Sequence, residues 1–198
     1  PDFEAPTDSG GNNVYDLIVQ VSDGSLTGSQ TITVTVTNTN DNGAGAISDT
    51  NPAANSLAEN AANGTTVGIT AFAVDPDVGD TINYSLDNDA GGRFVIDANT
   101  GIVTVANSGL LNYEAATSHN ILVRATSSDS SFTTANFTIS LTDINEFPVS
   151  PVSDTNVATN SVAENAANGT VVGVTAFASA ADATNNTVTH RLSTAARA

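Results

Sequence analysis

Short clusters of acidic and amide side chains recur along this sequence. The spacing of Asp75-Pro76-Asp77 aims two carboxylates from one turn at one point, and Asn40-Asp41-Asn42 joins a carboxylate to two amides. Glu59 and Glu164 each stand directly before an Asn. Hard cations such as Ca²⁺ bind about six to eight oxygen atoms from carboxylates, amides and backbone carbonyls. Because the clusters supply these oxygen types, they predict sites for a hard divalent cation.

The overall charge agrees with a bound cation. The chain has 21 acidic residues and 4 basic ones, all Arg, and a formal net charge of −17. Such a surface repels nucleic acid phosphates and anionic membranes, so neither is an expected partner. It also repels itself, so a bound cation stabilises the compact chain. From composition alone, acidity that only keeps a secreted protein soluble is an equally good interpretation.

Cysteine is absent, which excludes disulfides, thiolate metal sites and thiol catalysis. Small extracellular domains usually need disulfides or a bound metal for stability, and a metal ion is the expected substitute for disulfides here. No apolar run approaches the ~20 residues that span a bilayer, so no membrane span is predicted within the chain. The sequence opens in mid-pattern at Pro1-Asp2-Phe3-Glu4 and contains no Met, so we expect a piece of a longer protein.

No set of side chains predicts catalysis. His119 and His190 have no second His or Cys nearby in the sequence, which argues against zinc. No combination of Ser, His and acid indicates a nucleophile. Asp75 and Asp77 as a glycosidase pair would lack an aromatic platform and a basic clamp, and Trp is absent. We therefore predict that the chain is not an enzyme.

The clusters belong to an internal repeat with an offset of 105 residues. Residues 56–65 return as 161–170, and residues 70–73 return as 175–178. This repeat predicts the C-terminal part of a first unit at 1–45, a complete second unit at 46–148, and the N-terminal part of a third unit at 149–198. The period is too long for a solenoid and matches a string of β-sandwich domains of about 100 residues each.

The second unit is rich in strand signals that are separated by turns. Alternating apolar residues predict strands at 56–58, 66–73, 82–86, 94–96, 102–105, 120–126 and 132–142. The apolar stripe of Phe137, Ile139 and Leu141 has a counterpart in Ile32, Val34 and Val36 of the first unit. No segment has the pattern of an amphipathic helix. We predict an all-β fold, a tandem array of Greek-key, seven-stranded, immunoglobulin-like β-sandwiches.

At these residues the sequence resembles cadherin repeats, of the kind found in large bacterial surface and secreted proteins. Glu59-Asn60 and the run from Ala73 to Gly79 match the family's early Glu-Asn and A-x-D-x-D-x-G. Residues 111–114 match L-D-x-E with Asn for Asp, and residues 143–148 match the D-x-N-D-N-x-P linker with Glu for the second Asp. Residues 93–103 are similar to the family's F-x-I-D-x-x-T-G-x-I hairpin. The lack of Lys and Cys favours bacterial proteins over animal cadherins.

The resemblance implies calcium ions between consecutive units, held by the early Glu, the D-x-E and the linker of one unit and by the D-x-D of the next. At the first junction, where the first unit meets the second, the implied side-chain ligands are Asp2, Glu4, Asn40, Asp41, Asp75 and Asp77, with carbonyls from Thr39 and Asn42. At the second junction they are Glu59, Asn112, Glu114, Asn145, Glu146 and Asp182.

Two departures from the family pattern affect these sites. The second unit reads Ala125-Thr126-Ser127 where the family has A-x-D, whereas the first unit keeps Asp23 there. This change puts one ion of the first junction in question. The third unit reads Ala180-Ala181-Asp182 where the second has Asp75-Pro76-Asp77, so it lacks one ligand. We therefore predict fewer or weaker ions at the second junction. Because the third unit lacks its remaining strands, we also predict that it does not fold alone.

By resemblance, the expected role is an extracellular, cell-surface adhesion module that calcium makes rigid. Its expected partners are neighbouring units of the same chain, like adhesin molecules or surface glycans. Two alternatives remain open at this point. One is a mechanical spacer in a large secreted protein, which the absence of an exposed Trp anchor favours. The other is a polysaccharide-binding accessory module.

Overall fold

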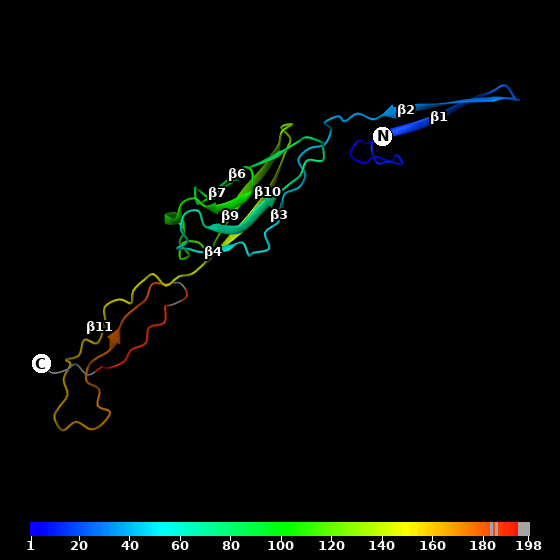
Figure 1. Cartoon of the computed structure of the whole chain (residues 1–198). Coiled ribbons are helices and arrows are strands. Elements are labelled where there is room, and N and C mark those ends of the chain that lie inside the picture. Colours follow the sequence, from blue (N-terminus) through cyan, green and yellow to red (C-terminus); the bar gives the residue numbers. More distant parts are fainter. Residues whose placement is uncertain (183, 185, 194–198) are drawn as a thin grey trace.

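A computed structural model describes residues 1–182, 184 and 186–193. The chain is elongated, with an N-terminal hairpin, a thicker middle and a C-terminal segment in a row (Figure 1). The hairpin consists of β1 (Val14–Ser22) and β2 (Thr27–Thr35). The middle, called the central sandwich below, contains β3 (Ser48–Asp49), β4 (Ser56–Ala58), β5 (Thr66–Phe72), β6 (Ile82–Asn88), β7 (Phe94–Ile96), β8 (Ile102–Val105), the 3₁₀ helix η1 (Ser108–Leu110), β9 (Ser118–Ser127) and β10 (Phe132–Thr142). The C-terminal segment contains β11 (Ser153–Asp154) and β12 (Ala176–Phe177).

The central sandwich has two four-stranded sheets, with strand orders β4-β10-β9-β6 and β3-β5-β8-β7. Pairing is antiparallel except between β4 and β10, which run parallel. The chain therefore changes sheets between β3 and β4. The side chain of Asp49 accepts hydrogen bonds from the backbone N–H groups of Asn51 and of Thr70 on β5, so it ties the end of β3 to its partner strand. The strand predicted at 56–58 is β4, and β3 adds an eighth strand to the predicted seven.

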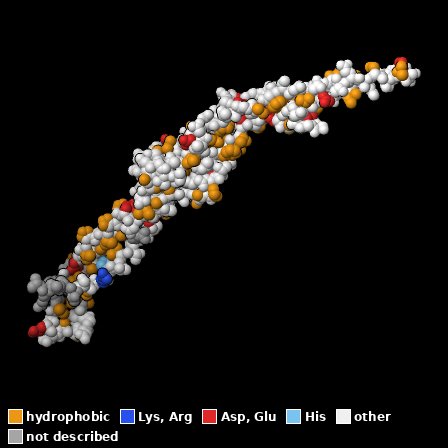
Figure 2. Space-filling model, viewed as in Figure 1, with side chains coloured by type: hydrophobic (Ala, Val, Ile, Leu, Met, Phe, Trp, Pro, Cys, Tyr) orange, Lys and Arg blue, Asp and Glu red, His pale blue; other side chains and the backbone are white. Residues whose placement is uncertain are grey.

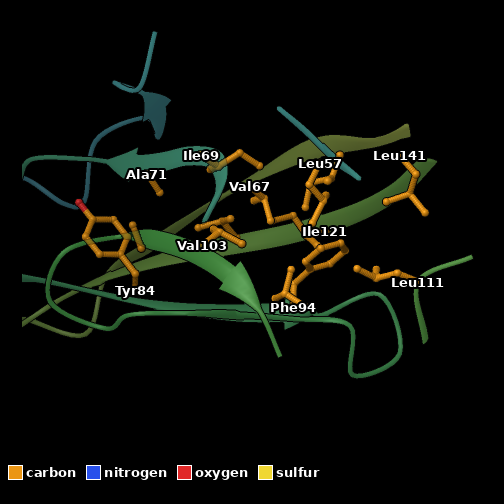
Figure 3. Close-up of a cluster of buried hydrophobic side chains, with 14 of the residues drawn as sticks. Leu57, Val67, Ile69, Ala71, Tyr84, Phe94, Val103, Leu111, Ile121 and Leu141 are labelled. Atoms are coloured by element: carbon orange, nitrogen blue, oxygen red, sulfur yellow. The ribbon is translucent and has the colours of Figure 1, made fainter. Parts of the chain in front are cut away.

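The core lies between the two sheets (Figure 3). On β5 and just after it, Val67, Ile69, Ala71 and Ala73 are buried, which confirms the predicted alternation. The other buried apolar side chains come from both sheets and from one loop: Leu57, Tyr84, Phe94, Val103, Val105, Leu111, Ile121, Val123, Ala125, Ile139 and Leu141. The predicted all-β sandwich is thus confirmed for this part of the chain.

The two flanking segments lack a second layer in the described structure. Ile32 and Val34 on β2 are 44% and 45% exposed, so the predicted apolar stripe is present without a packing partner. In the space-filling view the central sandwich is the thickest part, and apolar side chains lie at the surface of the C-terminal segment (Figure 2). The unit boundaries at 45 and 148 stay a prediction.

Candidate metal centres

The loop from β5 to β6 carries the first group of acidic side chains. Ala73, directly after β5, donates its backbone N–H to the Tyr84 hydroxyl at 2.9 Å, which fixes the start of the loop to β6. Asp75 Oδ1 accepts from the Asp77 N–H at 3.1 Å, and the Asp80 N–H donates to the Asp77 carbonyl at 3.2 Å. These turns, with Pro76 between the first two acids, fold the loop back on itself and gather its carboxylates.

The linker at residues 40–45 is tied to the same end of the sandwich. The Ala44 N–H donates to Ser131 Oγ and the Gly45 N–H to the Val74 carbonyl, both at 2.8 Å. A Cβ atom at residue 45 would lie only 2.8 Å from the Val74 oxygen, so this close approach requires glycine. The linker is therefore held against the β5–β6 loop.

Asp77 is the residue on which loop and linker converge. Its side chain is 3% exposed. Asp77 Oδ2 accepts from the backbone N–H groups of Asp41 at 3.2 Å and Asn42 at 2.7 Å, and Oδ1 accepts from the Asn42 side-chain amide at 3.3 Å. Because both partners lie 35 or 36 residues away in the linker, Asp77 joins the two segments.

Two acidic clusters share Asp77. The linker cluster contains Glu4, Asp41 and Asp77, and the loop cluster contains Asp75, Asp77 and Asp80. In each cluster the nearest carboxylate oxygens all lie within 4.8 Å of one another. A cavity of about 330 Å³ beside the linker cluster is lined by Pro1, Asp2, Phe3, Glu4, Val36, Thr37, Thr39, Asp41 and Asn42.

The other end of the sandwich carries the second-junction cluster, which contains Glu59, Glu114, Asp143 and Glu146 within the same 4.8 Å limit. Glu59 is 4% exposed and spans two segments. Its Oε2 accepts from the Tyr113 N–H at 2.5 Å, and its Oε1 accepts from the Ile144 N–H at 2.9 Å. Glu59 therefore holds the 112–114 loop and the second linker together.

Asp182 lies 105 residues after Asp77 and makes the corresponding contact with a linker. It is 2% exposed and accepts at Oδ1 from the Glu146 N–H at 3.1 Å and the Phe147 N–H at 3.5 Å. Asp182 Oδ2 is buried without a hydrogen-bond partner in the described structure. Thr184 donates its N–H at 3.2 Å and its hydroxyl to Asp143 Oδ2. The contact between linker and Asp is thus repeated at an offset of 105 residues.

The electrostatics of both junctions penalise the ionised acids. Loss of hydration raises the pKa of Glu4, and the charges of Asp77, Asp41 and Asp2 raise it further. Loss of hydration likewise raises the pKa values of Asp143 and Glu146, and neighbouring carboxylates add to both shifts. Among the described residues, the recorded ion pair is Arg124 with Asp87, away from these clusters.

The donor set fits a hard cation. Glu4 Oε1, Asp75 Oδ2, Asp143 Oδ1 and Asp182 Oδ2 are buried oxygens that lack a hydrogen-bond partner in the described structure. Carboxylate and carbonyl oxygens are the ligands that Ca²⁺ prefers, and a divalent ion offsets the repulsion between clustered acids. When bound, calcium would supply that positive charge and join the segments that carry its ligands.

The raised pKa values predict how stability depends on pH in metal-free buffer. A carboxyl group whose pKa is higher in the folded chain than in the unfolded chain destabilises the folded state while it is ionised. As pH falls, this group takes up a proton in the folded chain first. Its destabilising effect therefore fades as pH falls toward the pKa of the unfolded chain, about 4. The lowered pKa values of Asp87 and Asp97 act oppositely, since the stability they give is lost as pH falls below about 4. We expect the melting temperature to rise from pH 7 to about pH 5 and to fall below about pH 4.

Thermal unfolding followed by circular dichroism, in buffer stripped of divalent ions, checks this expectation. With calcium present the trend from pH 7 to about pH 5 should reverse, because protons compete with the ion for the same oxygens. If the melting temperature of the metal-free chain falls steadily as pH is lowered from 7, the ionised carboxylates at the junctions do not destabilise the fold, and the expectation is wrong.

The structure brings most of the predicted residues together. The linker cluster unites Glu4, Asp41 and Asp77, Asp75 lies in the loop cluster, and Glu59, Glu114 and Glu146 share the second-junction cluster. Of the remaining predicted residues, Asp2, Thr39 and Asn42 line the cavity, and Asn40 contacts Asp80. Asp182 contacts the second linker, and Asn145 is exposed. Asn112 Oδ1 accepts a hydrogen bond from the Ala115 N–H at 2.6 Å. As cation ligands all of them stay predictions.

Asp80 and Asp143 belong to the clusters but were absent from the predicted ligands. Asp143 opens the linker motif at 143–148, so its place in the sequence was a usable signal. Asp80 follows Gly79 at the end of the A-x-D-x-D-x-G run, and only the turn of the loop brings it back to Asp75 and Asp77.

The sequence predicts no membrane span within the chain. Among the residues described, no helix is long and apolar enough to cross a membrane.

Known proteins show which family this chain resembles. The cadherin domain profile matches residues 54–142. Cadherin domains are non-enzymatic adhesion modules. A comparison with curated proteins found no match. The protocadherin gammaB7 EC3-6 cis-dimer is similar in fold, with a TM-score of 0.68 and 22% identity over 88% of this chain and 44% of the solved one.

Two further solved structures are 25% identical to this chain. The protocadherin gammaB4 extracellular domain has a TM-score of 0.62 over 88% of this chain and 27% of its own. Mouse cadherin-23 EC22-24 has a TM-score of 0.60 over 89% of this chain and 56% of its own. The chain thus spans between about a quarter and just over half of these relatives. The sequence profile, the sandwich topology and the matched structures agree, and residues 54–142 of this chain are a cadherin domain.

Proposed function

We propose that this chain binds calcium at both ends of its cadherin domain and that the ions hold consecutive units of a tandem array in fixed orientation. The observation that carries the proposal is Asp77. It belongs to two carboxylate clusters at once, and it also receives the linker N–H groups of Asp41 and Asn42. An ion at this position would touch the linker and the sandwich together, so its binding energy would oppose bending between them.

The two junctions are expected to bind calcium unequally. The first has two clusters that share Asp77, whereas the second has one cluster among the described residues. Ala180 stands where the second unit has Asp75, so a carboxylate is missing from the third unit. We infer that the first junction holds more ions and holds them more tightly.

The array is proposed to act outside the cell, as an adhesion segment at a cell surface. Support comes from the cadherin domain and from the likeness to cadherin and protocadherin extracellular structures, one of which is a cis-dimer. Contact with a like molecule is the proposed form of adhesion. Analytical ultracentrifugation in calcium should therefore show reversible dimers, and a strict monomer at all concentrations would favour a spacer instead.

Calcium binding itself is tested by isothermal titration calorimetry of the whole chain. We expect one ion for each of the three clusters, with dissociation constants of roughly 10⁻⁴–10⁻³ M or tighter, the range of extracellular modules. Magnesium should bind more weakly, since it requires a smaller octahedral site. No heat and no rise in melting temperature at millimolar calcium would overturn the proposal.

A further inference from the structure

The hairpin of β1 and β2 has an apolar face that no second layer covers in the described structure. Paired residues of antiparallel strands lie on the same face, and the pairing of Leu17 with Ile32 repeats that of Ile121 with Phe137 on β9 and β10. Leu17 is 52% exposed, whereas Ile121 is fully buried in the core of the central sandwich. This surface, called the hairpin face below, consists of Tyr15, Leu17, Val19, Val21, Ile32 and Val34.

The C-terminal segment also has an open apolar face. Val174 follows Ile69 by the repeat offset of 105 residues and is 50% exposed, whereas Ile69 is 1% exposed in the core. A groove of about 500 Å³ lies on this face. The lining side chains that repeat apolar positions of the central sandwich, called the C-terminal face below, are Val152, Val174, Ala176 and Ala178.

Residues 160–164 have the sequence of an edge strand without its partner. They read Asn-Ser-Val-Ala-Glu, and residues 55–59, which contain β4, read Asn-Ser-Leu-Ala-Glu. In the central sandwich the Ser140 N–H on β10 donates to the Asn55 carbonyl at 2.9 Å and helps to hold β4 parallel to β10. Residues 160–164 form no strand in the described structure, and no described strand lies beside them to supply the bonds that β10 gives to β4.

The hairpin and the C-terminal segment carry two parts of one packing arrangement. The hairpin repeats β9 and β10, and the C-terminal segment repeats β3, β4 and β5. In the central sandwich β4 extends the sheet of β9 and β10, and β5 lies in the other sheet of the sandwich. The C-terminal segment of one copy therefore has the sequence elements that would cover the hairpin face of another copy and extend its free edge.

Charge favours this pairing over contact between two hairpins. Residues 1–45 contain Asp and Glu but no Lys, Arg or His. Two hairpins brought face to face would therefore set acid against acid. Arg191 and His190 line the C-terminal groove, so the groove offers a cation to the acidic side chains of the hairpin.

The two faces of a single copy cannot meet each other. The hairpin and the C-terminal segment lie at opposite ends of the elongated chain, with the central sandwich between them (Figure 1). Contact between the faces therefore requires a second copy. Because the two faces differ, each copy in a pair keeps one face open for a further copy, and the contact produces open rows of molecules.

We propose that copies of this chain associate head to tail, with the C-terminal face of one copy seated on the hairpin face of the next. Residues 160–164 then extend β2 in parallel, as β4 extends β10. Val162 takes the place beside Val36 that Leu57 takes beside Leu141 in the central sandwich. Neither face contains a residue of the acidic clusters, so the association needs no calcium and goes beyond the proposed function.

The test is sedimentation velocity of the whole chain over a range of concentrations, in calcium and in chelator. The wild-type chain should form species larger than a dimer in both buffers. Leu17→Asp and Val174→Asp should each weaken the association on the order of tenfold or more, because each places a charge in the apolar contact. The controls Ile18→Asp and Val171→Asp change exposed apolar residues outside the two faces and should associate like the wild type. Circular dichroism verifies that the variants keep the strand content of the wild type.

A mixture of the two blocked variants gives the sharper result. Leu17→Asp keeps its C-terminal face and Val174→Asp keeps its hairpin face, so the mixture retains one working contact. In chelator, each variant alone should stay monomeric at concentrations where the wild type associates. An equimolar mixture should form a dimer with one copy of each variant and should not grow further.

A wild-type chain that stays monomeric in chelator would overturn the proposal, and so would a mixture that does not dimerise. Loss of association in only one of the two variants would do the same, since it would show that a face pairs with itself. Dimers that form only in calcium, and equally in both variants, would support the adhesion contact of the proposed function and overturn this one. Leu17→Asp leaves the acidic clusters unchanged, so it is also the form in which a single copy is measured.

Discussion

Replacing Asp77 with Asn is expected to remove most of the stability that calcium gives at the first junction. Asp77 is the one residue that both first-junction clusters contain, so both lose a charged ligand at once. An ion that binds only the folded junction stabilises it by about 2.7 kcal/mol at a hundredfold excess over its dissociation constant. For a domain of about 100 residues, 1 kcal/mol corresponds to roughly 4 °C in melting temperature. The calcium-induced rise should therefore shrink by on the order of 10 °C or more.

Without calcium the same substitution should be nearly neutral or slightly stabilising. Asn keeps the shape and one oxygen to accept from the linker N–H groups, while one negative charge leaves a crowded acidic site. Differential scanning calorimetry with calcium and with chelator separates the two effects. Asp182→Asn is the matched control, because Asp182 makes the equivalent linker contact at the second junction. An Asp77→Asn chain with the full calcium response would contradict the shared-ligand assignment.

The strands of the central sandwich could be predicted because alternation is a local property. Val67, Ile69 and Ala71 alternate along β5, and all three are buried. The two-residue strand β3 could not be predicted, since two residues carry no period, and its partner β5, where Thr70 contacts Asp49, lies 21 residues away along the chain. Alternation also says nothing about the partner layer, which is why Ile32 and Val34 form the predicted stripe and yet lie exposed.

The acidic sites could be predicted only as far as repeated motifs define them. Glu4, Asp41 and Asp77 come from three separate motifs, and the structure gathers them into one cluster. Asp80 could not be predicted, because its place depends on contacts with Asn40 and Ser128, which lie 40 and 48 residues away. The side-chain oxygen of Asn112 accepts a hydrogen bond from the Ala115 N–H of its own turn, a contact that the motif alone does not predict.

Removal of calcium is expected to loosen the array more than it changes the sandwich itself. The sandwich is held by its apolar core, whereas the first linker is held by few hydrogen bonds, notably those of Ala44, Gly45 and Asp77. Without a cation, the clustered carboxylates at both junctions repel each other across those seams. The sheets should therefore survive chelation while the angles at the junctions become variable.

Small-angle X-ray scattering of the whole chain, with calcium and then with chelator, tests this claim most directly. We predict a single elongated particle with a sharp maximum dimension in calcium. In chelator, we predict a broad distribution of dimensions with an unchanged far-ultraviolet circular dichroism spectrum. Superimposable scattering curves in the two buffers would contradict the account, because calcium would then not fix the units relative to one another.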